Sequence, residues 1–152
     1  MPKVNLPAMT RVPDGIHRVL GGGLGPFGTR LLSDPGGLTQ FGAFIEELPP
    51  GSRSSFRHWH ETEDEMVHVL TGEVVLIEDR ETQMQAGEAA AWPAGLAVGH
   101  CLENRSNAIA RYLVIGTRNH SDRYHYPDHD LIVEKDGDLR RDFHADGRPR
   151  HD

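Results

Sequence analysis

The chain has 152 residues, which is enough for one domain that buries roughly 70% of its unfolded surface. Its formal net charge of −7 argues against a nucleic-acid partner, because no stripe of Lys and Arg is present to neutralise phosphates. The single cysteine, Cys101, excludes an internal disulfide framework and favours a reducing, cytoplasmic compartment.

The first forty residues predict an irregular N-terminal arm, residues 1–40, with a few short strands. Five prolines interrupt this arm, and it contains no continuous apolar segment, so we expect neither a signal peptide nor a membrane anchor. The longest apolar-leaning run of the chain, Ala89 to Gly99, is broken by Pro93. It is shorter than the about 18 residues that a membrane-spanning helix needs.

A glycine-rich stretch in the arm, G-L-G-P-F-G at residues 23–28, fits the pattern of a dinucleotide-binding loop. That chemistry needs a strand before the glycines and a helix after them, whose N-terminus holds the pyrophosphate. Pro26 lies inside the motif, and Pro35 with its two following glycines leaves no room for a full helix. The stretch is therefore interpreted as a loop without cofactor.

Six short strand-like segments follow, separated by glycines and prolines, and they predict an all-β sandwich or barrel. We expect residues 41–117 to form the barrel core. The segments are Phe41 to Leu48, Phe56 to His60, Glu65 to Leu70, Val74 to Glu78, Ala89 to Trp92 and Ala108 to Gly116.

From residue 118 the chain becomes polar. Residues 118–152 are too few for a second domain, so we expect an extension that packs on the barrel or on a dimer partner. The turn signals Asp136-Gly137 and Asp146-Gly147 predict short hairpins. A second metal site in this tail is disfavoured because its candidate ligands share no periodicity; they are His120, His125, His129, His144, Asp128 and Asp130.

The stretch R-H-W-H-E-T-E-D-E at residues 57–65 carries the main chemical signal. Side chains at i and i+2 share a face of a strand, so His58 and His60 can point inward together while Trp59 points away. Two imidazoles are half of a metal site, which a carboxylate and a third imidazole would complete. The residues alone leave the carboxylate open among Glu61, Glu63, Asp64 and Glu65.

This stretch resembles the first motif of the cupin superfamily, and a downstream stretch resembles the second. The first motif corresponds to Gly51, His58, His60, Glu65 and Gly72, and the second to Gly87, Pro93, Gly95, His100 and Asn104. The spacing of six residues between glutamate and glycine selects Glu65. Four residues separate Gly95 from His100, where the family usually has two.

The resemblance implies a jelly-roll barrel, the double-stranded β-helix of cupins, with one divalent metal ion (Zn, Mn, Fe or Ni). It implies that His58, His60, Glu65 and His100 hold this ion. On β parity Glu65 faces the interior, and His68, three residues later, faces outward. Cys101 is expected to face away from the site, and Trp92 to pack at a strand end rather than hold a substrate.

Two classes of function follow from this interpretation. The first is a metal-dependent isomerase, lyase or dioxygenase that acts on a small oxygen-rich molecule. The alternative is a non-catalytic binding or sensing module in which the metal anchors a small-molecule ligand; a structural metal is a weaker third possibility. The serines of residues 52–55 lack the context of a hydrolytic nucleophile. We also expect a homodimer formed through sheet edges and the N-terminal arm.

Overall fold

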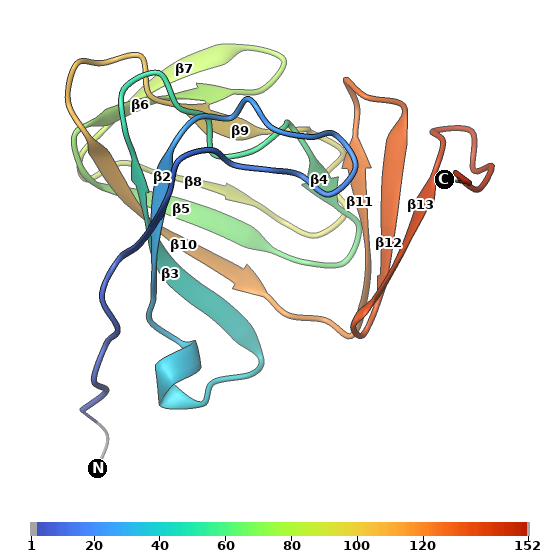
Figure 1. The fold of residues 1–152 in the computed structure, drawn as a ribbon, viewed down its shortest axis with the longest axis horizontal. Helices are drawn as coiled ribbons and strands as arrows, with labels where there is room; N and C mark the ends of the chain where they lie inside the picture. The colour runs from blue at the N-terminus through green and yellow to red at the C-terminus, as the bar shows by residue number, and fades with distance from the viewer. Residues whose placement is uncertain (1–2, 152) are drawn as a thin grey trace.

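The computed structural model describes residues 3–151, and its regular structure is almost entirely antiparallel β (Figure 1). One short 3-10 turn, η1 (Asp34–Gly36), interrupts the strands. The strands are β1 (Thr10–Val12), β2 (Phe27–Leu31), β3 (Phe41–Leu48), β4 (Trp59–His60), β5 (Glu65–Thr71), β6 (Glu73–Ile77), β7 (Glu81–Gln85), β8 (Ala89–Trp92), β9 (Cys101–Glu103), β10 (Ala110–Thr117), β11 (Ser121–Tyr126), β12 (Leu131–Asp136) and β13 (Leu139–Phe143).

Two sheets enclose the main core. The larger has the order β1-β2-β3-β10-β5-β8, and the smaller has the order β7-β6-β9. Inward residues alternate along each strand, so Val67 and Val69 of β5 meet Val74 and Leu76 of β6 in one apolar cluster. Each such buried side chain stabilises the fold by roughly 1.5–3 kcal/mol. This two-layered, all-antiparallel arrangement is the jelly-roll barrel that the sequence predicts.

Two motif residues shape the closed end of the barrel. Gly72 alone connects β5 to β6 with φ of 74°, and a Cβ there would lie 2.9 Å from the carbonyl oxygen of Ile109. The side chain of Asn104 is fully buried, and its Nδ2 donates to the carbonyl oxygens of Leu48 and Ala108 at 2.7 and 2.8 Å. Gly72 and Asn104 therefore shape the backbone of the barrel rather than contact a ligand.

The polar tail supplies β11, β12 and β13, drawn in orange at the right of Figure 1, and these form a third sheet with β4 in the order β13-β12-β11-β4. It is attached to the barrel because β11 pairs with β4, with Tyr124 opposite His60 and His125 opposite Trp59. The inner face of this sheet packs under the N-terminal arm, where Val19 and Leu20 contact a cluster built on Leu131. The turn at Asp136-Gly137 joins β12 to β13 as expected.

Five observed strands of the two barrel sheets match the expected ones closely. The bounds of β3 and β8 are those expected, and β5, β6 and β10 differ by two residues or fewer. The expected strand from Phe56 to His60 is wrong, since only Trp59–His60 is a strand. The backbone bends at residues 54–57, and His58 pairs with His100 only as an isolated bridge.

The glycine-rich stretch is a loop, as expected. Its amides at Gly23 and Gly25 donate to the carboxylate of Asp14, both at 2.8 Å. Strand β2 begins inside the stretch, at Phe27, so no helix N-terminus is available there for a pyrophosphate. Within residues 3–151 no helix is both long enough and apolar enough to cross a membrane.

Candidate metal centre

The four side chains expected to bind a metal come from three separate parts of the barrel and converge at its open end. Ligand atoms of His58, His60 and Glu65 all lie within 4.8 Å of one another. The fourth, His100, is brought in by a two-residue bridge in which its backbone pairs with that of His58. Residues 96–99 lie outside any strand before this bridge, and they leave His100 Nε2 3.4 Å from the Glu65 carboxylate.

Hydrogen bonds orient all three imidazoles in the same way. The Nδ1 atom of His58 lies 2.9 Å from the carbonyl oxygen of Phe56, and that of His100 lies 3.1 Å from the carbonyl oxygen of Val98. In His60 the Nδ1 atom lies 2.7 Å from a carboxylate oxygen of Asp122. Each Nδ1 therefore donates its proton to an acceptor, and each Nε2 is left to face the cluster.

The geometry around Glu65 fits a bound cation. Its two carboxylate oxygens lie 3.4 Å from His60 Nε2 and 3.4 Å from His100 Nε2. Two atoms that are each about 2.1 Å from one ion are about 3.0–3.4 Å apart at octahedral or tetrahedral angles. His100 Nε2 is buried and makes no hydrogen bond with any residue among 3–151, which is a costly state unless a ligand binds there. The donor set therefore fits a divalent transition metal.

The electrostatics of the cluster favour a cation as well. Burial lowers the pKa of His58 to about 4, so this imidazole is neutral near pH 7 and can donate a lone pair. Burial opposes a charge on His60, but its bonds to Asp122 and Glu65 raise its pKa to about 9. Burial also disfavours the Glu65 carboxylate, and the surrounding histidines reverse this and lower its pKa. Metal and proton would therefore compete for His60 Nε2.

Asp122, on β11, supports the site and was not identified from the sequence. Its side chain is fully buried, and its second oxygen accepts the amide and the hydroxyl of Thr62, both at 2.9 Å. A carboxylate behind a ligating histidine fixes the ring and makes its other nitrogen more basic. Asp122 lies 62 residues after His60, and only the pairing of β11 with β4 brings the two together.

The acidic residues before Glu65 are engaged with other groups. Glu63 lies in the connection between β4 and β5, where a charged side chain is normally solvated, but its side chain is only 11% exposed and pairs with Lys135. The tail sheet covers Glu63, which explains the difference. Asp64 accepts the amide of Ala94 at 2.7 Å, and Glu61 lies 2.7 Å from His125 Nε2. Although Glu63 is near His60 and Asp122, the Lys135 ammonium already balances its charge.

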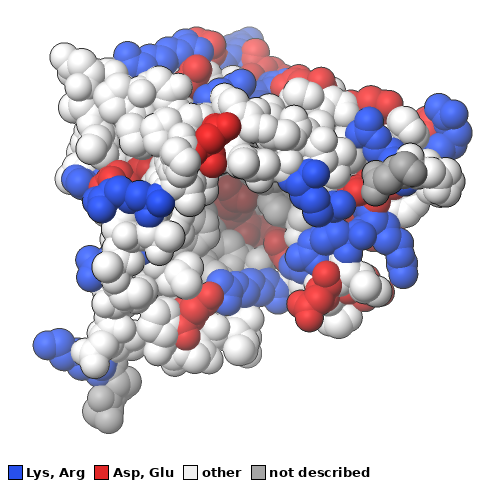
Figure 2. Space-filling view, in the orientation of Figure 1, with Lys and Arg blue, Asp and Glu red and all other residues white. Residues whose placement is uncertain are grey.

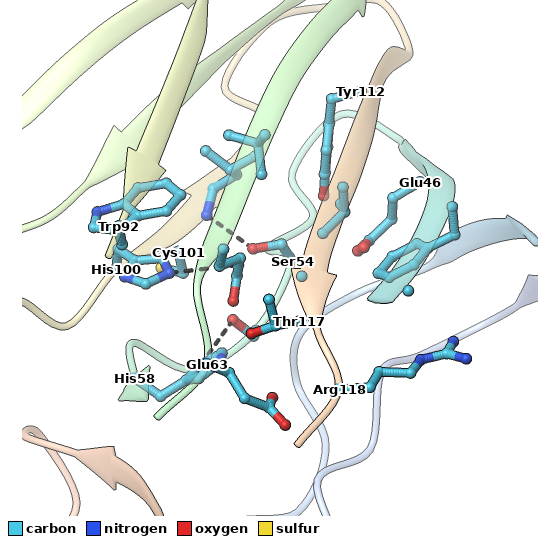
Figure 3. Close-up of a pocket in the computed structure, with 18 residues that line it drawn as sticks. Glu46, Ser54, His58, Glu63, Trp92, His100, Cys101, Tyr112, Thr117 and Arg118 are labelled. Carbon is cyan, nitrogen blue, oxygen red and sulfur yellow. Dashed lines mark hydrogen bonds and ion pairs between the residues drawn. The ribbon is translucent and has the colours of Figure 1, made fainter. Parts of the chain in front are cut away.

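A cavity of about 300 Å³ opens in front of the cluster. Figure 2 shows the hollow, with acidic atoms in its depth. Trp92 closes one wall and stacks on His100, with ring centroids 3.7 Å apart. Cys101 was expected to face away from the site, but although it is buried it also lines this cavity (Figure 3). Its position at the start of β9, just after the bridge, explains the difference.

The opposite wall holds a carboxylate that the sequence did not single out. Glu46 of β3 lines the cavity and lies directly across the sheet from Tyr112 of β10. Burial raises the pKa of Glu46 to about 7, and the charge of Glu65 acts in the same direction. The adjacent Glu47 points to the other face, where Arg11 and Arg111 both pair with it and lower its pKa.

The remaining histidines lie outside the cluster. His68 is on the outer face of β5, between exposed Met66 and Leu70, as expected from parity. In the tail, His125 stacks on Trp59 at 4.1 Å, and His144 lies 2.7 Å from Asp130. Within residues 3–151 no tail histidine belongs to a group that could hold a metal.

Comparisons with known proteins agree with this architecture. The family model described as a cupin domain matches residues 44–116. No functionally curated protein matches the sequence. A crystal structure from Silicibacter pomeroyi, described as a sugar phosphate isomerase from the cupin superfamily, is 37% identical, with 99% of this chain and 97% of that chain covered and a TM-score of 0.89.

Two further solved structures are similar over much of the chain. One from Acidithiobacillus ferrooxidans, whose description also names a sugar phosphate isomerase, is 26% identical, with 82% of each chain covered and a TM-score of 0.74. One from Thermotoga maritima, described as a predicted oxalate decarboxylase, is 24% identical, with 62% of this chain and 83% of that chain covered and a TM-score of 0.54. The last likeness concerns the fold alone.

Proposed function

The chain belongs to the cupin superfamily, and from this premise we propose that it is a metal-dependent isomerase of a phosphorylated sugar. The reaction class and the substrate class are taken from the Silicibacter pomeroyi protein, which is similar over nearly the whole length of both chains. The observation that carries the proposal is the convergence of three imidazoles and Glu65 at the base of a cavity large enough for a small sugar.

In this proposal His58, His60, Glu65 and His100 hold one divalent metal ion. The ion would polarise a carbonyl or hydroxyl oxygen of the bound sugar. The protein supplies the rest: Asp122 and two backbone carbonyls hold the rings in place, and Trp92 fixes His100 by stacking. Zinc, manganese, iron and nickel all suit three imidazoles and one carboxylate.

The test combines elemental analysis with an activity screen. Protein purified without chelator is analysed for metal, and then incubated with terminal phosphate esters of glyceraldehyde, ribose, mannose and glucose. We expect about one metal ion per chain and interconversion of at least one aldose with its ketose. Metal content with tight binding of a phosphorylated sugar but no turnover would instead establish the binding or sensing function.

We also propose that the chain forms a homodimer through the outer face of its large sheet. Two cross-strand rows on this face are almost wholly apolar: one runs through Ala43, Ile115, Met66 and Ala91, and the other through Ile45, Leu113, His68 and Ala89. Part of this face stays exposed in the single chain, including Met66. A second copy would bury it. A cytoplasmic location is proposed on the single cysteine, which is a buried free thiol.

A further inference from the structure

Two neighbouring glutamates on β3 face opposite sides of the sheet and have opposite surroundings. The carboxylate of Glu47 is 4% exposed and is held by the guanidinium groups of Arg11 and Arg111 at 2.9 and 2.8 Å. Glu46 points into the cavity, and within residues 3–151 no Lys, Arg or His forms an ion pair with it. Glu46 is partly buried, and a partly buried carboxylate with no cation beside it is a candidate functional group.

The group nearest to Glu46 across the sheet is also unusual. Tyr112 faces Glu46 in the register between β10 and β3. Its hydroxyl is buried and makes no hydrogen bond of regular geometry with residues 3–151, but it lies close enough to the Glu46 carboxylate for a hydrogen bond between them to contribute to the raised pKa of Tyr112. Figure 3 shows that the Tyr112 hydroxyl and the Glu46 carboxylate are directed into the same part of the cavity. Burial is the main cause that raises the pKa of Tyr112, and the Glu46 charge adds to it.

Glu46 is separate from the metal cluster. It belongs to no group of described residues that could hold a metal, and no hydrogen bond or ion pair joins it to the four proposed ligands. It lines the same cavity as His58, Glu65 and His100, but from β3 rather than from the strands and loops that carry them. A sugar bound in this cavity would therefore lie between the cation and Glu46.

We propose that Glu46 is the base that carries a proton between C1 and C2 of the sugar, with Tyr112 as its positioning residue. This inference rests on the proposed isomerase function. Glu46 takes the proton from C2 of the aldose, and the C–H electron pair becomes the C1–C2 double bond while the carbonyl pair moves to O1, which gains a proton. The hydroxyl on C2 then loses its proton and becomes the carbonyl. The proton held by the Glu46 carboxyl exchanges with water in the open cavity, and Glu46 then delivers a proton to C1.

The step balances, because O1 gains one proton and O2 loses one, C2 loses one proton and C1 gains one, and no oxidant or reductant is used. A carboxylate serves as both base and acid most effectively when its pKa is close to the working pH. The raised pKa of Glu46, about 7, agrees with this role, whereas an exposed glutamate would hold a proton too weakly.

The deciding experiment follows deuterium from solvent into the sugar. Metal-loaded wild type, Glu46→Gln and Glu47→Gln are incubated in D₂O with the aldose phosphate that the wild type converts. We expect the wild type and Glu47→Gln to place deuterium on carbon. In Glu46→Gln both turnover and deuterium incorporation should fall by about 10²–10⁴-fold. Metal content and calorimetric binding of the aldose phosphate should stay within about threefold of wild type, which separates loss of the base from loss of the site.

Two further variants keep the test decisive. Glu46→Asp retains a carboxylate but withdraws it, so it should keep measurable deuterium exchange where Glu46→Gln has none. Tyr112→Phe should lower turnover less than Glu46→Gln does, and loss of its hydroxyl should shift the pH profile of turnover, which a purely structural role would leave in place. Turnover by Glu46→Gln within tenfold of wild type, or isomerisation without any deuterium on carbon, would overturn the role of Glu46 while the isomerase function stands. No turnover by the wild type on any of the sugars would overturn the function, and the proposed base with it.

Discussion

Replacing Glu46 by Gln should make the metal-free protein more stable near neutral pH, with an advantage that disappears in mild acid. The carboxylate has its pKa raised from 4.5 to about 7 in the folded protein, mainly through burial. Between these two pH values the folded chain keeps the proton on Glu46 and the unfolded chain has lost it. The free energy of unfolding therefore decreases as pH rises through this range.

The size of the effect follows from the two pKa values. Integrated from pH 5 to pH 8, the linkage lowers the stability of the wild type by about 2–3 kcal/mol. Glutamine at position 46 does not titrate, so the difference in unfolding free energy between Glu46→Gln and wild type should shift by that amount in favour of the variant. Neighbouring groups titrate in both proteins, so their contributions to the unfolding free energy largely cancel in the difference between the two.

Urea unfolding of chelated protein at pH 5, 6, 7 and 8, followed by tryptophan fluorescence, measures this difference. Glu47→Gln is the matched control. In the wild type, the pKa of Glu47 is lowered in the folded protein. The Glu47 carboxylate therefore stabilises the fold above about pH 4.5, and this stabilisation is lost only as pH falls through the folded pKa. The stability change of this control should therefore be unfavourable and nearly constant from pH 5 to 8. A Glu46→Gln difference that does not vary with pH would refute the reasoning on burial.

Four further predictions concern the site and the assembly. Glu65→Gln keeps the shape and removes the charge, so metal content by elemental analysis should fall clearly, whereas Asp64→Asn should stay loaded; the reverse pattern would mean that the register of β5 is wrong by one residue. Asp122→Asn removes the charged acceptor behind His60, and metal affinity by competitive titration should fall about 10–100-fold; an unchanged affinity would contradict its supporting role. Chelation should lower the melting temperature of the wild type without abolishing cooperative unfolding, because saturation at 100 times the dissociation constant adds about 2.7 kcal/mol and the core closes without metal; complete unfolding on chelation would count against this. Ile115→Lys should give a monomer mass by light scattering at micromolar concentration where the wild type gives a dimer, and a monomeric wild type would exclude the dimer.

The sequence predicts the barrel and the convergence of four side chains because both depend on local patterns. Strand parity places Glu65 with Val67, and the motif spacing finds His100 despite two additional residues. What it could not predict depends on contacts between distant segments. Nothing near Asp122 in the sequence indicates that β11 will pair with β4.

Glu46 was missed for a different reason. It stands beside Glu47 in a strand, and alternation alone indicates that one of the two must face inward, but not which one. Two adjacent acidic residues inside a strand whose other residues are mostly apolar nonetheless indicate that one carboxylate faces the interior. One member of such a pair either meets a cation from another segment, as Glu47 does with Arg11, or occupies a functional cavity.

The pairing of β11 with β4 also bears on where the working unit of this protein ends. The region matched by the family model stops at residue 116, and it contains all four proposed ligands. The carboxylate that orients His60 lies six residues beyond that limit, in a sheet that the barrel does not need in order to close its core. A chain trimmed to the matched region would keep every ligand yet lose the hydrogen bond to Asp122 that orients His60. When the site of one cupin is inferred from a relative, the segment after the barrel should therefore be compared as well. Two cupins with identical ligands can differ in how firmly those ligands are held.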